Sequence, residues 1–131
     1  VLYLQKVSLN KGGYVFLISS LHVKEPSEQL ILSNCYRIAL ISVIKSLSKI
    51  LVKKNITFIN IAPGPTKTNR FNNLLKKNKI KISKFKKELN LNYIPEPIEI
   101  AEFVKIVVEK KIKSLNGQTI GFDSGINKFI F

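Results

Sequence analysis

Two short apolar runs separated by a long apolar helical stretch restrict the fold of this chain more than any other feature. Residues 14–19 (YVFLIS) and 56–62 (ITFINIA) are rich in β-branched and aromatic residues, and glycine, serine or proline bounds each run. Such runs are typical of strands that are buried on both faces, as in a parallel sheet. Between them, residues 30–53 carry apolar residues on more than one helical stripe. This pattern predicts a helix that packs on the sheet and on a further surface.

The rest of the chain continues the alternation of helices and strands. Residues 1–10 are predicted to be the end of a helix, and residues 98–111 an amphipathic helix with Pro97 in its first turn. Residues 118–123 predict a third strand. The polar, lysine-rich residues 65–95 are interpreted as a substrate lid. This order predicts right-handed crossovers and an α/β fold, a Rossmann-like doubly wound parallel sheet of about three strands with flanking helices.

Parallel α/β sheets bind ligands beyond the carboxyl ends of their strands. In this sequence three segments follow predicted strands directly: Ser19-Ser20, Ala62-Pro63-Gly64 and Asp123-Ser124. We therefore expect these segments to form the edges of a binding site.

The strongly positive charge of the chain raises the question of nucleic-acid binding. Lysine and arginine total 22 against 8 acidic residues, which gives a formal net charge of +14. Basic residues bind phosphate backbones, but arginine is preferred for bidentate recognition, and here 20 of the 22 are lysine. We interpret the charge as a compositional bias on a solvated surface and keep a basic nucleic-acid-binding domain as a minor alternative.

The most apolar window, residues 30–52, is long enough to cross a membrane but contains Lys45 and Lys49. Because charges are costly in hydrocarbon, we expect a helix of a soluble protein and no membrane partner. The single Cys35 fits the reducing cytoplasm. No metal site is expected. Since the sequence starts at Val1 and lacks methionine, we expect it to be part of a longer chain.

Four segments in order resemble motifs of the short-chain dehydrogenase/reductase family. These are residues 13–20 for the strand that ends in a catalytic serine, 60–68 (NIAPGPTKT) for the N-x-x-P-G-x-x-x-T segment, 95–101 for the start of the last helix, and 116–125 for the last strand. Each motif is weak alone, but their consistent spacing indicates the family. The resemblance implies that residues 1–131 are the carboxyl-terminal part of one NAD(P)-binding Rossmann-type domain, whose amino-terminal half carries the glycine-rich pyrophosphate loop.

In this family a serine holds the substrate carbonyl, a tyrosine on the next helix exchanges the proton, and a lysine four residues later binds the nicotinamide ribose. By resemblance, the serine is Ser20, but Ser33 stands at the tyrosine position and Arg37 at the lysine position. An aliphatic hydroxyl is a far weaker acid than a phenol, and arginine stays protonated. Together with Thr68-x-Arg70, this departure resembles a divergent branch of the family that lacks the usual tyrosine and lysine.

The resemblance also implies a cofactor site for NAD or NADP. Its expected residues are Arg37, Pro63, Gly64, Thr66 and Thr68. Glycine at position 64 is expected to let the backbone approach the nicotinamide closely.

Two further side chains have a functional and a purely structural interpretation. Tyr36 lies three residues after Ser33 and would reach the nicotinamide only after a small rotation of the helix, so we favour a surface tyrosine. His22 follows the serine strand, and we favour an incidental loop histidine.

The leading hypothesis is an NAD(P)-dependent oxidoreductase that transfers hydride between nicotinamide and a carbonyl or alcohol substrate, resembling 3-oxoacyl-carrier-protein reductase-like members. Because Ser33 and Arg37 depart from the family pattern, a catalytically degenerate subunit or scaffold that still binds cofactor is the alternative. The resemblance further implies a homodimer or homotetramer that assembles through the helix of residues 30–53.

Overall fold

The structure, a computed structural model, describes residues 12–129. The predicted end of a helix at residues 1–10 lies outside these described residues. The strands are β1 (Gly13–Ile18), β2 (Ile56–Pro63) and β3 (Gln118–Phe122), and the α-helices are α2 (Ile31–Ile50), α3 (Asn69–Lys77), α4 (Ile82–Glu88) and α5 (Pro97–Glu109). Three short 3-10 helices are η1 (Leu21–Val23), η2 (Glu28–Leu30) and η3 (Val52–Lys54).

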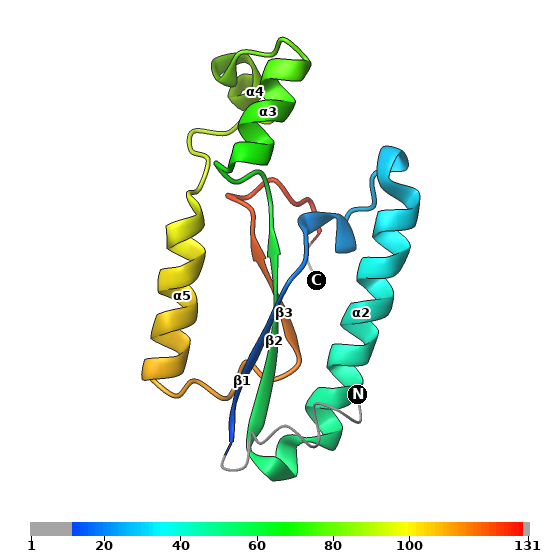
Figure 1. Cartoon of the computed structure of the whole chain (residues 1–131), viewed down its shortest axis with the longest axis vertical. Coiled ribbons are helices and arrows are strands. Elements are labelled where there is room, and N and C mark those ends of the chain that lie inside the picture. Colours follow the sequence, from blue (N-terminus) through cyan, green and yellow to red (C-terminus); the bar gives the residue numbers. More distant parts are fainter. Residues whose placement is uncertain (1–11, 130–131) are drawn as a thin grey trace.

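The three strands form one parallel sheet in the order β1-β2-β3. Gly13 pairs with Ile56 at one end of the β1–β2 ladder, and Ile59 pairs with Gln118 where β3 joins. Helix α2 covers one face of the sheet and α5 covers the other (Figure 1). The predicted doubly wound α/β architecture is therefore confirmed.

The central strand β2 organises the core because its side chains alternate between the two faces. Phe58 points to the α2 side, where it packs with Leu47 of that helix. Ile59 and Ile61 point to the other side and pack with Val107 of α5. All residues of β2 except the last are buried, as the apolar run at residues 56–62 predicts.

Strand β1 is less buried than its sequence indicates. Its residues are partly buried, and Ile18 at its end is 53% exposed. Within the described residues, β1 pairs only with β2, so its outer edge has no neighbouring strand. The prediction of a strand at residues 14–19 is confirmed, but the burial of its two faces is only partial: Val15 and Leu17 pack on the α2 side, and Tyr14 and Phe16 pack on the α5 side. A strand at a sheet edge lacks the neighbour that would cover it.

Helix α2 packs with one apolar face and exposes another. Ile44 and Leu47 lie against the sheet, whereas Leu32 and Ile38 are exposed. The segment Glu28–Ile50 is long and apolar enough to cross a membrane by length and composition alone. Its contacts with the sheet show that it serves here as the helical layer of an α/β fold. Within the described residues, the outer face of α2 does not pack against the further surface that its apolar pattern predicts.

The predicted lid, residues 65–95, contains α3 and α4, which lie beyond the carboxyl ends of the strands (Figure 1). Four buried residues, Phe71, Leu75, Leu91 and Ile94, form a small core of its own. The rings of Phe71 and Phe85 meet edge to face with centroids 5.2 Å apart. The apolar residues scattered through this lysine-rich segment therefore fold it into a compact unit.

Candidate functional site

A pocket of about 750 Å³ opens at the carboxyl ends of β1 and β2, and residues of α2 and the lid also line it. Six of the seven predicted site residues line it: Ser20, Arg37, Pro63, Gly64, Thr66 and Thr68. These residues come from three separate parts of the chain, and the parallel sheet brings them to one edge. The ends of β1 and β2 therefore line one pocket, and the roles of these residues in a binding site stay a prediction.

The third predicted edge, Asp123-Ser124, does not line this pocket. Both residues line a separate hollow of about 350 Å³ beside Tyr93 and Glu99. The Asp123 carboxylate accepts hydrogen bonds from the backbone N–H groups of Gly125 (3.1 Å) and Asn127 (3.2 Å). Its side chain therefore closes the turn after β3, and the expectation that it borders the shared site is wrong.

The two serines at the end of β1 have different hydrogen bonds. The Ser19 hydroxyl donates to the carbonyl oxygen of Ile61 (3.2 Å), so it is engaged in the sheet. The Ser20 hydroxyl oxygen accepts a hydrogen bond from the backbone N–H of His22 (3.3 Å) and caps η1. This bond fixes the Ser20 side chain and leaves its O–H free to donate to a ligand. The structure thus favours Ser20 over its neighbour as the polar group of the pocket.

His22 also lines the pocket. Its Nδ1 lies 3.1 Å from the carbonyl oxygen of Glu25. Because a carbonyl oxygen only accepts, Nδ1 carries the hydrogen, and Nε2 is left to exchange a proton with a ligand. Sequence reasoning interpreted His22 as incidental. Its position two residues after Ser20, on the same turn, was the signal that pointed to the pocket.

Ser33 is not among the lining residues, although it lies one helical turn before Arg37. Residues four apart share a helix face, but the serine side chain is short, whereas arginine reaches much further from the helix axis. Next to it, the Asn34 side chain donates to the carbonyl oxygen of Ser27 (2.8 Å) and ties the start of α2 to the preceding loop. The catalytic role of Ser33 stays a prediction without support from its position.

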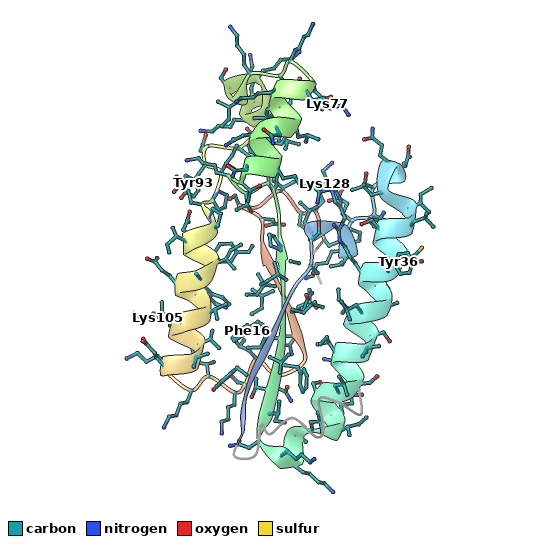
Figure 2. All side chains as sticks on the ribbon, in the orientation of Figure 1. Phe16, Tyr36, Lys77, Tyr93, Lys105 and Lys128 are labelled. Atoms are coloured by element: carbon teal, nitrogen blue, oxygen red, sulfur yellow. The ribbon has the colours of Figure 1, made fainter. Side chains whose placement is uncertain are left out.

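Tyr36 lies on the outer side of α2, where its side chain is 77% exposed. Figure 2 shows it pointing away from the sheet, and it does not line the pocket. This position agrees with the surface interpretation. The single Cys35 beside it is exposed and has a free thiol.

Arg37 reaches the pocket from α2. One of its terminal guanidinium nitrogens, Nη1, is buried and has no hydrogen-bond partner among the described residues. A buried donor that is left unpaired costs about 1–3 kcal/mol. A ligand oxygen that accepts from Nη1 would remove this cost, so the arrangement fits a bound polar group such as a ribose hydroxyl.

The turn after β2 depends on Gly64. Its backbone N–H donates to the carbonyl oxygen of Phe122 (3.0 Å), which joins this turn to the end of β3. A Cβ at this position would lie 2.9 Å from Cα of Asp123, closer than real side chains allow. The glycine is thus required by the close approach of β3, a reason that the sequence alone did not reveal.

The two threonines after this turn both line the pocket but differ in what they can donate. The Thr66 hydroxyl donates to the carbonyl oxygen of Gly64 (3.1 Å). The Thr68 hydroxyl oxygen accepts from the backbone N–H of Phe71 (3.1 Å) and caps α3. Thr68 therefore keeps its hydroxyl hydrogen available for a ligand, whereas Thr66 uses its own to stabilise the turn.

A polar network attaches the lid to the first turn of α5. Lys67 forms an ion pair with Glu96 (3.1 Å), and its backbone N–H donates to the carbonyl oxygen of Pro95 (2.8 Å). The Tyr93 hydroxyl donates to the carboxylate of Glu99. This hydrogen bond lowers the pKa of Glu99 and raises the pKa of Tyr93. The two ends of the lid are thus held at one helix terminus.

Within residues 12–129, no group of three or more His, Cys, Asp and Glu side chains could hold a metal ion. The polar groups of the pocket are hydroxyls, one imidazole, guanidiniums and backbone groups. Such a set suits hydrogen bonding to an organic ligand.

A parallel sheet with helices on both faces and a polar pocket at the carboxyl ends of its strands defines a Rossmann-like α/β protein. A family model described as Enoyl-(Acyl carrier protein) reductase matches residues 2–127. The chain therefore belongs to the short-chain dehydrogenase/reductase family, as its motifs indicate.

Solved structures share the fold of this chain. A short-chain oxidoreductase from Pseudomonas aeruginosa PAO1, described as NADPH-bound and containing an atypical catalytic center, is 13% identical with a TM-score of 0.78 over 89% of this chain. L-Sorbose reductase from Gluconobacter frateurii, complexed with NADPH and L-sorbose, is 21% identical with a TM-score of 0.77 over 92%. A short-chain dehydrogenase/reductase from Serratia marcescens BCRC 10948 is 22% identical with a TM-score of 0.73 over 90%.

The match covers only part of these relatives. This chain spans 47% of the Pseudomonas and Serratia proteins and 49% of the sorbose reductase. Among curated protein sequences, none matches the chain.

Proposed function

We propose that this chain forms the carboxyl-terminal half of an NAD(P)-dependent oxidoreductase, which transfers a hydride between nicotinamide and a carbonyl or alcohol substrate. The observation that carries the proposal is the single pocket that Ser20, Arg37, Gly64 and Thr68 share at the carboxyl edge of the sheet. A preceding segment would supply the glycine-rich half of the cofactor site. The NADPH-bound relatives with the same fold support this cofactor class.

The residues of the pocket fit such a cofactor. Its volume of about 750 Å³ lies within the usual range for small-molecule sites. The buried, unpartnered Nη1 of Arg37 is a donor suited to a ribose hydroxyl, and the free hydroxyl hydrogen of Thr68 suits a carboxamide or phosphate oxygen. When bound, the nicotinamide would supply or accept the hydride.

Ser20 and His22 can supply the polar part of the reaction. With its oxygen held by the His22 backbone, Ser20 donates its hydroxyl hydrogen to the substrate carbonyl oxygen and orients it. In the reducing direction this oxygen gains a proton as the carbon gains the hydride. When His22 is protonated on both ring nitrogens, it can deliver that proton from Nε2, and solvent then returns a proton to the ring. In this proposal His22 takes over the proton transfer that the family assigns to a tyrosine, because the tyrosine position is occupied by Ser33.

The proposal is tested on the protein at its natural length, with NADH and NADPH, against a panel of aldehydes and ketones. We expect turnover, and we expect Ser20→Ala to lower kcat/KM about 100-fold, as loss of a donor to the reacting oxygen does. Ser19→Ala is the matched control, because that hydroxyl is engaged by Ile61. Equal losses in the two variants would contradict a specific role for Ser20.

The role of His22 has its own readout in the pH profile. His22→Gln should lower kcat and remove the limb of the profile that reports an imidazole, while cofactor affinity stays unchanged. An unaltered profile would exclude His22 as the proton donor.

The alternative is a catalytically degenerate subunit that binds cofactor without turnover. The absence of Ser33 from the pocket lining, together with arginine at the lysine position, favours this alternative. The relative with an atypical catalytic center, however, binds NADPH, which supports cofactor binding despite such departures. If fluorescence titration shows cofactor binding but no carbonyl compound of the panel is turned over, the result supports the degenerate subunit.

We also propose a cytoplasmic homodimer or homotetramer. The exposed apolar face of α2, which includes Ile31, Leu32 and Ile38, supports association through this helix. Light scattering on the protein at its natural length tests this proposal, and a monomer at micromolar concentration would contradict it.

A further inference from the structure

The two arginines of the chain differ from its lysines in where they lie. The sequence has 20 lysines and only two arginines, Arg37 and Arg70. Both arginines line the main pocket, and none of the lysines between residues 12 and 129 lines it. A general enrichment in basic residues does not explain this, because lysine is far more frequent. Arg37 is partly buried in the pocket and Arg70 is exposed, and both place a guanidinium group where a ligand in the pocket can contact it.

Within residues 12–129, neither arginine forms an ion pair with an acidic side chain. The pocket lining contains neither aspartate nor glutamate. In the described part of the chain every ion pair involves a lysine: Lys67–Glu96, Lys84–Glu88 and Lys105–Glu109. Positive charge that is left unpaired in a pocket is complementary to an anionic ligand. A guanidinium can also bind both oxygens of a carboxylate or phosphate at once, which an ammonium group does not.

Arg70 contributes to the pocket from the lid. It is the second residue of α3 and lies in the first turn of this helix, which Thr68 caps. Thr68, Phe71 and Leu74 line the pocket as well, so the first turns of α3 face it. The Phe71 side chain anchors this part of the helix in the lid core. The amino-terminal end of α3 adds a partial positive charge beside the guanidinium.

Much of the remaining pocket lining is apolar. Ile18, Leu30, Leu74 and Ile100 come from four different parts of the fold. A ligand that fits both features has an apolar body and an anionic group that reaches the lid.

We infer that Arg70 binds a carboxylate or phosphate group of the substrate and so selects anionic over neutral carbonyl compounds. The inference rests on the proposed hydride transfer and adds the chemical class of the substrate. Arg37 reaches the pocket from α2, and its proposed role is to bind the cofactor. It is not needed for the selection of anionic substrates.

The test compares matched anionic and neutral probes on the protein at its natural length. One pair is 4-oxopentanoate and its methyl ester, and a second is dihydroxyacetone phosphate and dihydroxyacetone. The two pairs distinguish a carboxylate from a phosphate as the preferred group. We expect kcat/KM to be roughly 10- to 100-fold higher for the anionic member of at least one pair, the range of a charge-assisted hydrogen bond.

Arg70→Gln should reduce this preference to about one by raising KM for the anionic probe, with little change for the neutral probe. Arg70→Lys should restore only part of it, because lysine lacks the bidentate geometry. Lys77→Gln is the matched control. It removes one positive charge from the same helix, at an exposed residue on the outer side of the lid (Figure 2). This variant should keep the preference of the wild type.

Three outcomes would overturn the inference. The first is equal turnover of anionic and neutral probes by the wild type. The second is an Arg70→Gln variant with weakened cofactor binding and equal losses on both probes, which assigns Arg70 to the cofactor phosphates. The third is loss of preference in Lys77→Gln as well, which indicates a general effect of charge.

If no carbonyl probe is turned over, the proposed oxidoreductase fails, and the anion site is measured separately. In that case 4-oxopentanoate or inorganic phosphate, added with saturating NADPH, should raise the Tm of the wild type but not of Arg70→Gln. Equal shifts in both proteins, or none in either, would overturn the anion site.

Discussion

The sheet and the lid border the same pocket but are stabilised in different ways. Strand β2 is covered on both faces, and Phe58 within it is 1% exposed. Long-range backbone hydrogen bonds hold the strand ends, such as Ser19 N–H to Ile61 (2.8 Å) and Gly64 N–H to Phe122 (3.0 Å). The lid, in contrast, has a small core of four buried residues and a polar attachment to α5.

This difference assigns different tasks to the two regions. The sheet side carries Ser20 and the Gly64 turn, whose proposed roles require fixed positions. The lid side carries Arg70, whose proposed task is to recognise substrate. Regions of lower local stability can open and close without unfolding the rest of the protein. We therefore expect substitutions in the sheet to affect global stability and those in the lid to affect local opening and KM.

The largest effect is expected from Phe58→Ala. Removing this ring from the fully covered side of β2 should lower the free energy of unfolding by about 3–5 kcal/mol. Urea unfolding followed by circular dichroism measures the change. Phe129→Ala, at an exposed phenylalanine, is the control and should have little effect. If both variants lower the free energy of unfolding by similar amounts, Phe58 does not belong to a core that is more important for stability than the surface.

A somewhat smaller and local effect is expected from Phe71→Ala. The lid core should lose about 3 kcal/mol, so amide exchange in α3 and α4 should accelerate about 100-fold while β2 stays protected. Hydrogen exchange with mass spectrometry resolves the two regions. Leu89→Ala is the control, since Leu89 lies outside the lid core. If exchange in β2 accelerates to the same extent, lid and sheet unfold as one unit.

Gly64→Ala tests the junction between strand ends. The added Cβ would meet the backbone of Asp123 at 2.9 Å, so the turn must shift, at a cost of about 1–3 kcal/mol. We expect weaker cofactor binding together with a lower Tm. Gly121→Ala is a matched control, because a Cβ there would lie 3.9 Å from the side chain of the same Asp123. An unchanged Tm in Gly64→Ala would show that the junction is not tightly packed.

The smallest effect is expected from the Tyr93–Glu99 hydrogen bond, because it is exposed. The pKa of Glu99 is lowered first by the Tyr93 hydroxyl and then by the backbone N–H of Glu96, so its contribution is present above the usual glutamate value of 4.5 and is lost as pH falls through the lowered pKa. The pKa of Tyr93 is raised chiefly by the same bond, so that contribution is lost as pH rises above about 10.

Tyr93→Phe should therefore raise the pKa of Glu99 toward its usual value. Between pH 4.5 and about 10, it should also slightly accelerate amide hydrogen exchange in the lid. NMR titration of the Glu99 carboxyl carbon measures the first change. Lys67→Gln is a useful comparison, because Lys67 has a smaller influence on the pKa of Glu99. A Glu99 carboxyl that titrates at its usual value in the wild type would contradict the attachment.

Much of the fold could be predicted from the sequence. Periodicity located β1, β2, β3, α2 and α5 to within a few residues, because local patterns of apolar residues reflect secondary structure directly. The burial of β1 could not be predicted, since it depends on a neighbour along the sheet. The division of the lid into α3 and α4 also escaped prediction, because scattered apolar residues such as Phe71 and Leu91 become a core only after the chain folds back.

By itself the sequence determined the order of strands and helices and the motif positions that place the chain in its family. It also located the two strand ends, Ser20 and Gly64, that meet at the pocket. Only the tertiary structure decided that Arg70 and His22 join them, that Ser33 stays outside, and that Gly64 is required by Asp123. The physical reason is that secondary structure depends on neighbours within a few residues, whereas a pocket depends on contacts between segments far apart in the chain.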